Sequence, residues 1–183
     1  MNKNTIILGI DPGTNIMGYG LINIGEKDPV LIGFGCVEMH KFYDYYEKLK
    51  CIFERTLELL DQYKPVALAI ESQFYGNNVQ SMLKLGRAQG AAISAALYRS
   101  VPVFEYAPRK IKQSITGYGN ASKQQIAALL QKIMKFDTLP DKLDATDGLA
   151  VALCHYYQQG KKIPSGKFRG WEDFIRKNPE RVG

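Results

Sequence analysis

Near its N-terminus the chain reads Thr5-Ile-Ile-Leu-Gly-Ile-Asp-Pro-Gly-Thr-Asn-Ile-Met-Gly-Tyr-Gly20, an apolar run that passes through a turn into a glycine-containing segment. The run Thr5–Ile10 is short and rich in isoleucine, which favours a buried strand. Asp11-Pro-Gly13 is a turn signal. Because the apolar run stops at this turn, Asp11 is expected where the first strand ends. Gly18–Ile24 is a second strand candidate.

Further strands and helices are expected in an order that predicts a mixed sheet. Val30–Met39 follows a short polar turn, so the first three strands form an antiparallel meander. Beyond it, apolar runs alternate with segments of helical periodicity. The expected strands are Val66–Ile70 and Val101–Tyr106, and the expected helices are Tyr43–Tyr63, Val79–Tyr98, Ile111–Ile115, Lys123–Met134 and Leu143–Tyr157. The sequence therefore predicts an α/β fold with a mixed five-stranded sheet, in which an antiparallel meander precedes parallel strands and helices flank the sheet.

The bulk properties fit one soluble globular domain with a short appendage. The chain has 183 residues, of which 45% are hydrophobic and 23% charged. We expect one domain over residues 1–159 and a basic C-terminal tail over residues 160–183. The apolar run Ile6–Ile10 is too short for a signal peptide, and no run approaches the roughly 20 apolar residues of a membrane span, so a cytoplasmic location is expected. The three scattered cysteines point to neither a disulfide framework nor a zinc site.

Charge is unevenly distributed along the chain. The net charge is +6, and residues 84–135 hold nine basic residues against a single acidic one, whereas residues 136–159 hold four acidic residues against one basic. A basic stretch beside clustered acids fits a polyanionic substrate that is held by cations and cut at a metal. A solvated basic surface without a ligand explains the charge equally well.

Four carboxylates fall at strand ends or on one helix face. Asp11 and Glu71 end the first and fourth expected strands, and Asp144 and Asp147 stand three residues apart on the last expected helix. Singly, each has an ordinary explanation as a turn former or a solvated residue. Together, oxygen ligands without neighbouring histidine or cysteine favour Mg²⁺ or Mn²⁺. Two such ions about 4 Å apart can activate a water and stabilise the leaving oxygen of a phosphodiester, so the set predicts a metal-dependent nuclease.

Four ordered blocks of the sequence resemble the RuvC family of bacterial Holliday junction resolvases. The blocks are Gly9-Ile-Asp-Pro-Gly-Thr-Asn-Ile-Met-Gly-Tyr-Gly20, Ala69-Ile-Glu71 with Phe74, Tyr106-Ala-Pro-Arg-Lys-Ile-Lys-Gln113 and Asp144-Ala-Thr-Asp-Gly-Leu-Ala150. The resemblance runs over roughly residues 5–158 and implies a ribonuclease-H-like fold. It also implies a crossover junction endodeoxyribonuclease that nicks two strands of a four-way DNA junction by a two-metal mechanism, in homologous recombination and DNA repair.

The same resemblance implies the cofactor and the partners. By motif position, the four acids are its catalytic, metal-binding residues, with two Mg²⁺ ions for which Mn²⁺ can substitute. Its partners are four-way junction DNA, a second copy of the chain in a homodimer, and a branch-migration motor complex of the RuvA and RuvB type. The expected helix Val79–Tyr98 is rich in small residues, which makes it the candidate dimer interface.

Two lysines are the main candidates for contact with DNA beside the acids. The resemblance identifies Lys112 and Lys123 as cations near the site that contact DNA and stabilise charge in the transition state. Lys123 follows Ser122, which caps the expected helix, and helix N-termini bind anions. Arg109 and Lys110 are further DNA-binding candidates, although an ordinary solvated face explains these two equally well.

Two other positions carry expectations that the residues alone leave open. Phe74 stands three residues after Glu71 and is expected to stack on an unpaired base, with a core phenylalanine as the alternative. Gly148 stands where the family usually has alanine. Because glycine costs about 1 kcal/mol relative to alanine inside a helix, we expect it to loosen the support of the acids slightly.

Two other classes of function remain open. The Asp-Pro-Gly-Thr turn after a first strand also opens phosphotransferases and ATPases of the actin-like fold. Such proteins need a second lobe of comparable size, which 183 residues do not supply. The other alternative is a non-catalytic protein that binds junctions on the same fold, although the presence of all four acids gives no reason to prefer it.

Overall fold

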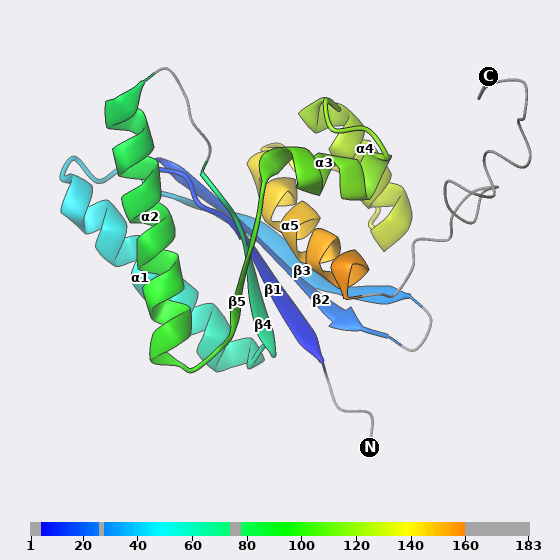
Figure 1. Cartoon of the computed structure of the whole chain (residues 1–183), viewed down its shortest axis with the longest axis horizontal. Helices are drawn as coiled ribbons and strands as arrows, with labels where there is room; N and C mark the ends of the chain where they lie inside the picture. Colours follow the sequence, from blue (N-terminus) through cyan, green and yellow to red (C-terminus); the bar gives the residue numbers. More distant parts are fainter. Residues whose placement is uncertain (1–4, 26–27, 74–77, 160–183) are drawn as a thin grey trace, which may run out of the picture.

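The fold is a five-stranded mixed sheet with helices on both faces (Figure 1). The computed structural model describes residues 5–25, 28–73 and 78–159, so the expected tail over residues 160–183 lies outside the described residues. The strands are β1 (Ile6–Asp11), β2 (Ile16–Ile24), β3 (Pro29–Glu38), β4 (Ala67–Glu71) and β5 (Val103–Tyr106). The helices are α1 (Tyr45–Tyr63), α2 (Val79–Tyr98), α3 (Pro108–Thr116), α4 (Lys123–Met134) and α5 (Asp144–Gln158).

The strand order is β3-β2-β1-β4-β5, with antiparallel pairs on one side of β1 and parallel pairs on the other. This confirms the mixed sheet that the sequence predicts. The helix α3 is longer than expected and begins at Pro108, three residues before the predicted start. Proline is favoured in the first turn of a helix because its missing N–H needs no partner there.

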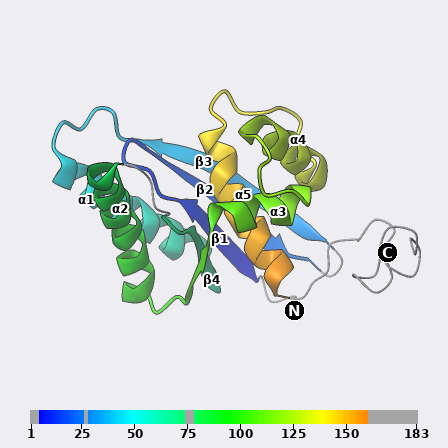
Figure 2. The same ribbon diagram turned by 45° about the horizontal axis from the view of Figure 1, so that its top comes forward.

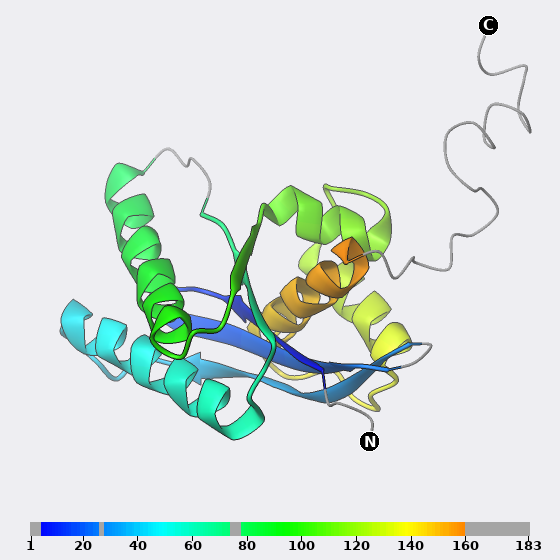
Figure 3. The same cartoon turned by 60° about the horizontal axis from the view of Figure 1, so that its bottom comes forward.

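Each face of the sheet has its own hydrophobic core, because neighbouring residues of a strand point to opposite faces. Ile6, Leu8 and Ile10 of β1 pack with α1 and α2 on one face. Ile7 packs on the other face with residues of α3, α4 and α5, of which α5 lies directly across the sheet. Figure 2 and Figure 3 show the two groups of helices separated by the sheet.

The parallel pairing of β1 with β4 brings two chain segments that are far apart in sequence to one edge of the sheet. Ile10 is in register with Ile70, so the residues that follow, Asp11 and Glu71, end neighbouring strands at the same edge. The first turn of α5 lies against this part of the sheet. None of the helices in the described part of the chain is long and apolar enough to span a membrane.

Candidate active site

Asp144 and Asp147 stand in the first turn of α5, and a close approach of two backbones places that turn beside the end of β1. Gly18 of β2 is in register with Asp11. A β-carbon on Gly18 would lie 2.2 Å from the carbonyl oxygen of Asp144, so only glycine allows α5 to approach here. The helix therefore brings its acids to the strand end that carries Asp11.

Gly148 makes the matching contact from the helix side. A β-carbon on Gly148 would lie 2.4 Å from the Cα atom and 2.5 Å from the nitrogen of Tyr19. The sequence suggested that Gly148 loosens the support of the acids, but its location shows a tight contact between α5 and β2. Sequence reasoning missed these two close contacts between α5 and β2, although the repeated glycines of the segment Gly18-Tyr-Gly20 were a signal for close packing.

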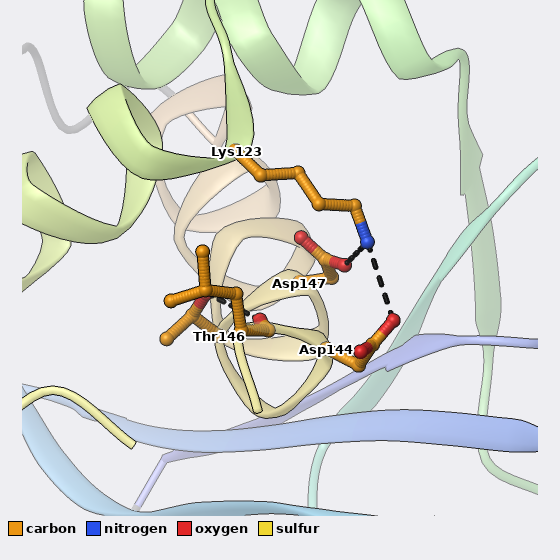
Figure 4. A network of polar contacts seen from close by, with 5 residues as sticks. Lys123, Asp144, Thr146 and Asp147 are labelled. Carbon is orange, nitrogen blue, oxygen red and sulfur yellow. Dashed lines mark hydrogen bonds and ion pairs between the residues drawn. The ribbon is translucent and has the colours of Figure 1, made fainter. Parts of the chain in front are cut away.

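Lys123 reaches from α4 to both acids of α5 (Figure 4). Its Nζ atom lies 2.6 Å from Oδ2 of Asp147 and 3.2 Å from Oδ1 of Asp144. A capping box fixes the start of α4: the Ser122 hydroxyl accepts the N–H of Gln125, and the Gln125 side chain accepts the N–H of Ser122. The helix start that the sequence predicted thus places the lysine where its ammonium bridges the two carboxylates.

A cavity of about 310 Å³ collects most of the predicted site residues. Its lining includes Asp11, Glu71 and Asp147 as well as both predicted cations, Lys112 and Lys123. The rest of its wall is mostly apolar and comes from α3, α4 and α5. Asp144 joins this group through its ion pair with Lys123. The structure therefore brings the four acids and the two lysines together.

Burial and mutual repulsion disfavour the ionised form of the carboxylates in this cavity. Burial, followed by repulsion from Asp147, raises the pKa of Asp11 to about 6. Burial, then the charges of Asp11 and Asp147, raises the pKa of Glu71 to about 8. Burial also raises the pKa of Asp147, although its hydrogen bond to Lys123 opposes that change. Such a group favours binding of a further cation.

The donor set fits a hard divalent cation in its chemistry. Carboxylate oxygens are the ligands that Mg²⁺ and Mn²⁺ prefer. Among the residues that the structure describes, no three histidine, cysteine, aspartate or glutamate side chains form a ready-made metal site. Instead, the Lys123 ammonium bridges two of the acids. Asp11, Glu71, Asp144 and Asp147 are the residues that could hold the metal once their side chains converge on it.

The other predicted DNA-binding residues have different locations. Arg109 and Lys110 lie on the exposed side of α3 and do not line the cavity. Phe74 lies outside the described residues.

Lys123 remains a cation in this site. Burial lowers the pKa of Lys123, but its hydrogen bonds to Asp147 and Asp144 outweigh burial and raise the pKa overall.

His155, to which the sequence assigned no role, is buried toward the C-terminal end of α5. Its Nδ1 atom lies 2.6 Å from the Tyr106 hydroxyl, and its Nε2 atom lies 2.8 Å from the Gln159 amide nitrogen. Burial lowers the pKa of this histidine. With both ring nitrogens paired and the ring packed on Phe104, His155 ties α5 to β5.

A model of the RuvC family, described as crossover junction endodeoxyribonuclease RuvC, matches residues 7–155. The RuvC protein of Cytophaga hutchinsonii is 55% identical over 188 residues, which cover 100% of this chain and 93% of that protein. The RuvC protein of Bacteroides fragilis is 53% identical and covers 98% of this chain and 97% of its own length. Both relatives span this chain almost completely.

Solved structures show the same fold. RuvC of Thermus thermophilus in complex with a Holliday junction substrate has a TM-score of 0.77 and 32% identity, covering 86% of this chain and 97% of that chain. The yeast mitochondrial Holliday junction resolvase Ydc2 has a TM-score of 0.64 at 14% identity, which is a likeness of fold alone. These matches confirm the ribonuclease-H-like fold that the resemblance implied.

Proposed function

Because this chain belongs to the RuvC family of crossover junction endodeoxyribonucleases, we propose that it resolves four-way DNA junctions by paired, metal-dependent nicks in recombination and repair. One observation carries the proposal. Asp11 and Glu71 from two parallel strands and Asp147 from α5 line one cavity together with Lys112 and Lys123. Acids that can hold metal thus lie beside cations that can hold phosphate, as hydrolysis of a phosphodiester requires.

The roles of the site residues follow from their positions. Asp11, Glu71, Asp144 and Asp147 would hold two Mg²⁺ ions, for which Mn²⁺ can substitute. When bound, such a pair activates a water and stabilises the leaving oxygen of the phosphodiester. Lys112 and Lys123 stand on the wall of the same cavity, where they would orient the scissile phosphate and balance the charge that develops on it.

The apolar part of the cavity wall contributes by excluding water. Ile111 of α3 and Ile126 of α4 are buried side chains that line it, next to Lys112 and Lys123. A low local dielectric strengthens the interaction of the lysines with a phosphate. Arg109 and Lys110, exposed on α3, would contact the DNA backbone further from the cut, and Phe74 would stack on a base near the crossover.

Paired nicks need two active sites, so the proposal includes a homodimer. The buried alanines of α2 (Ala88, Ala92, Ala95 and Ala96) pack inside the chain, which leaves the outer face of the helix for a partner. On that face, Val79, Met82, Leu83, Gly86 and Arg87 line a shallow, largely apolar hollow of about 350 Å³. Val79 and Leu83 are exposed. Leu83→Glu should convert the dimer to a monomer in analytical ultracentrifugation, and an unchanged dimer would exclude this face.

The proposal is tested with a synthetic four-way junction and a linear duplex of the same sequence. With Mg²⁺ the chain should nick the junction in two strands and leave the duplex intact, and a chelator should stop the reaction. Binding of the junction without nicking would favour the non-catalytic alternative, and ATP turnover by the pure protein would favour the phosphotransferase alternative. Full-length matches to endonucleases give no support to either alternative.

A further inference from the structure

Lys123 and the two acids of α5 form a contact whose members differ sharply in exposure. The side chain of Lys123 is 52% exposed, whereas that of Asp147 is 13% exposed. The carboxylate is held in place by its surroundings, but the ammonium is held mainly by the two ion pairs it makes. The lysine can therefore leave the acids without unpacking the core, and Asp147 cannot follow it.

The oxygens that the ammonium contacts are also oxygens that a metal would need. One lysine brings a single charge to Asp144 and Asp147, while Asp11 adds a further carboxyl group whose pKa Asp147 and Asp144 help to raise. The positive charge of Lys112, which also lines the cavity, opposes the rise in the pKa of Glu71 and of Asp147. Mg²⁺ brings two charges and takes carboxylate oxygens at close range, so it repels an ammonium beside the same oxygens and competes with it for them.

We propose that Lys123 occupies part of the metal site in the metal-free chain, and that metal binding displaces it from Asp144 and Asp147. The inference rests on the proposed function in that it takes these acids as metal ligands. Without metal, the Lys123 ammonium partly neutralises Asp144 and Asp147, and it competes with the metal for their oxygens.

The backbone position of Lys123 limits how far the displaced ammonium can move. Lys123 is the first residue of α4, and the capping box of Ser122 and Gln125 holds its backbone beside the cavity. The freed side chain remains on the cavity wall, where a phosphate of the substrate can take the place of the carboxylates. Metal binding thus prepares a phosphate contact, and by linkage a bound phosphate favours metal binding to the same degree.

The first test measures the affinity of the metal-free full-length chain for Mg²⁺ by isothermal titration calorimetry, without DNA. Lys123→Met should bind Mg²⁺ more tightly than the unmodified chain, by roughly fivefold or more, which is the lower end of coupling between linked sites. Lys123→Arg keeps the charge and should resemble the unmodified chain. Lys132→Met removes the same charge from the exposed far end of α4 and is the matched control. Equal or weaker Mg²⁺ binding by Lys123→Met would overturn the inference.

A second measurement uses the unmodified chain and does not depend on how a variant folds. Paired lysines react slowly with acylating reagents, so Mg²⁺ should increase the acylation of Lys123, read by mass spectrometry, and leave that of Lys132 unchanged. No increase at Lys123 would overturn the inference. Junction cleavage by the unmodified chain is measured in parallel. Cleavage without displacement of Lys123 sinks only this inference, whereas a chain that cannot cut sinks the proposed function.

Discussion

The Nζ atom of Lys123 lies 2.6 Å from Oδ2 of Asp147, and this ion pair joins the start of α4 to the first turn of α5. The contact links α4, which carries Lys123, to α5, which carries Asp144 and Asp147. It places the positive and negative parts of the site within one ion pair of each other. The lysine that we propose to bind phosphate and the acids that we propose to bind metal are therefore neighbours in the folded chain.

The two lysines of α3 should differ in their effect on the reaction. Lys112 lines the cavity, whereas Lys110 does not. We expect Lys112→Met to lower the single-turnover rate of junction cleavage by about 100-fold, as the loss of one charge-stabilising donor does in other enzymes. Lys110→Met should act mainly on junction affinity and on its salt dependence. If both variants lost similar amounts of cleavage rate, lining the cavity would not distinguish a lysine that acts on the reaction from one that acts on DNA binding.

The raised pKa of Glu71 predicts how the stability of the metal-free protein depends on pH. Burial and the nearby acids raise this pKa to about 8, whereas an unfolded glutamate titrates near pH 4.3. Between these values the folded state binds one more proton than the unfolded state, so stability falls as pH rises. The melting temperature should therefore decrease from about pH 6.5 to about pH 8, as measured by scanning calorimetry.

Glu71→Gln provides the control for this pH dependence. Glutamine does not titrate, so the variant should lose most of the decrease and be the more stable protein at pH 8 without metal. His155, whose pKa is lowered by burial, acts in the opposite direction, but only below about pH 6.5. An unmodified chain whose melting temperature stays flat across this window would contradict the electrostatics of the site.

Gly148→Ala tests the contact between α5 and β2. Alanine gains about 1 kcal/mol of helix propensity, but its β-carbon meets the backbone of Tyr19 at 2.4 Å. Overpacking of this kind costs typically about 1–3 kcal/mol, so we expect a net loss of stability in denaturant unfolding. Cleavage should fall as well, because the acids shift with the helix.

Gly90→Ala on α2 is the matched substitution for this test. A β-carbon there would meet nothing within 4 Å, so only the helix propensity remains and the variant should be more stable by about 1 kcal/mol. If both alanine variants were more stable than the unmodified chain, the contact between α5 and β2 would have room for a β-carbon at position 148, contrary to the prediction.

Much of the fold could be predicted because its signals are local. The strand ends at Asp11 and Glu71 follow from apolar runs that stop at polar residues, and the start of α4 follows from the capping residue Ser122. The pairing of Asp11 with Glu71 needed only the additional rule that neighbouring parallel strands end at the same edge. The sequence could therefore indicate which residues gather at the site.

The remaining features depend on contacts between segments that are distant in sequence. The ion pairs of Lys123 link positions that are 21 and 24 residues apart, and no periodicity indicates them. The contact of Gly148 with Tyr19 depends on how α5 crosses the sheet. From the sequence alone, Gly148 could be judged only by its low helix propensity. The small residues of α2 suggested a dimer interface, but the fold shows that Ala88, Ala92, Ala95 and Ala96 pack inside the chain.

The account depends most directly on Asp11, the acid at the end of the first strand. Asp11→Asn preserves the shape of the side chain and removes the charge, so it should still bind a synthetic four-way junction. The decisive measurement compares this variant with the unmodified chain for cleavage and for binding of the same junction in Mg²⁺. We expect cleavage to fall by at least about 100-fold while affinity is retained. A fully active Asp11→Asn protein would contradict the proposed metal site.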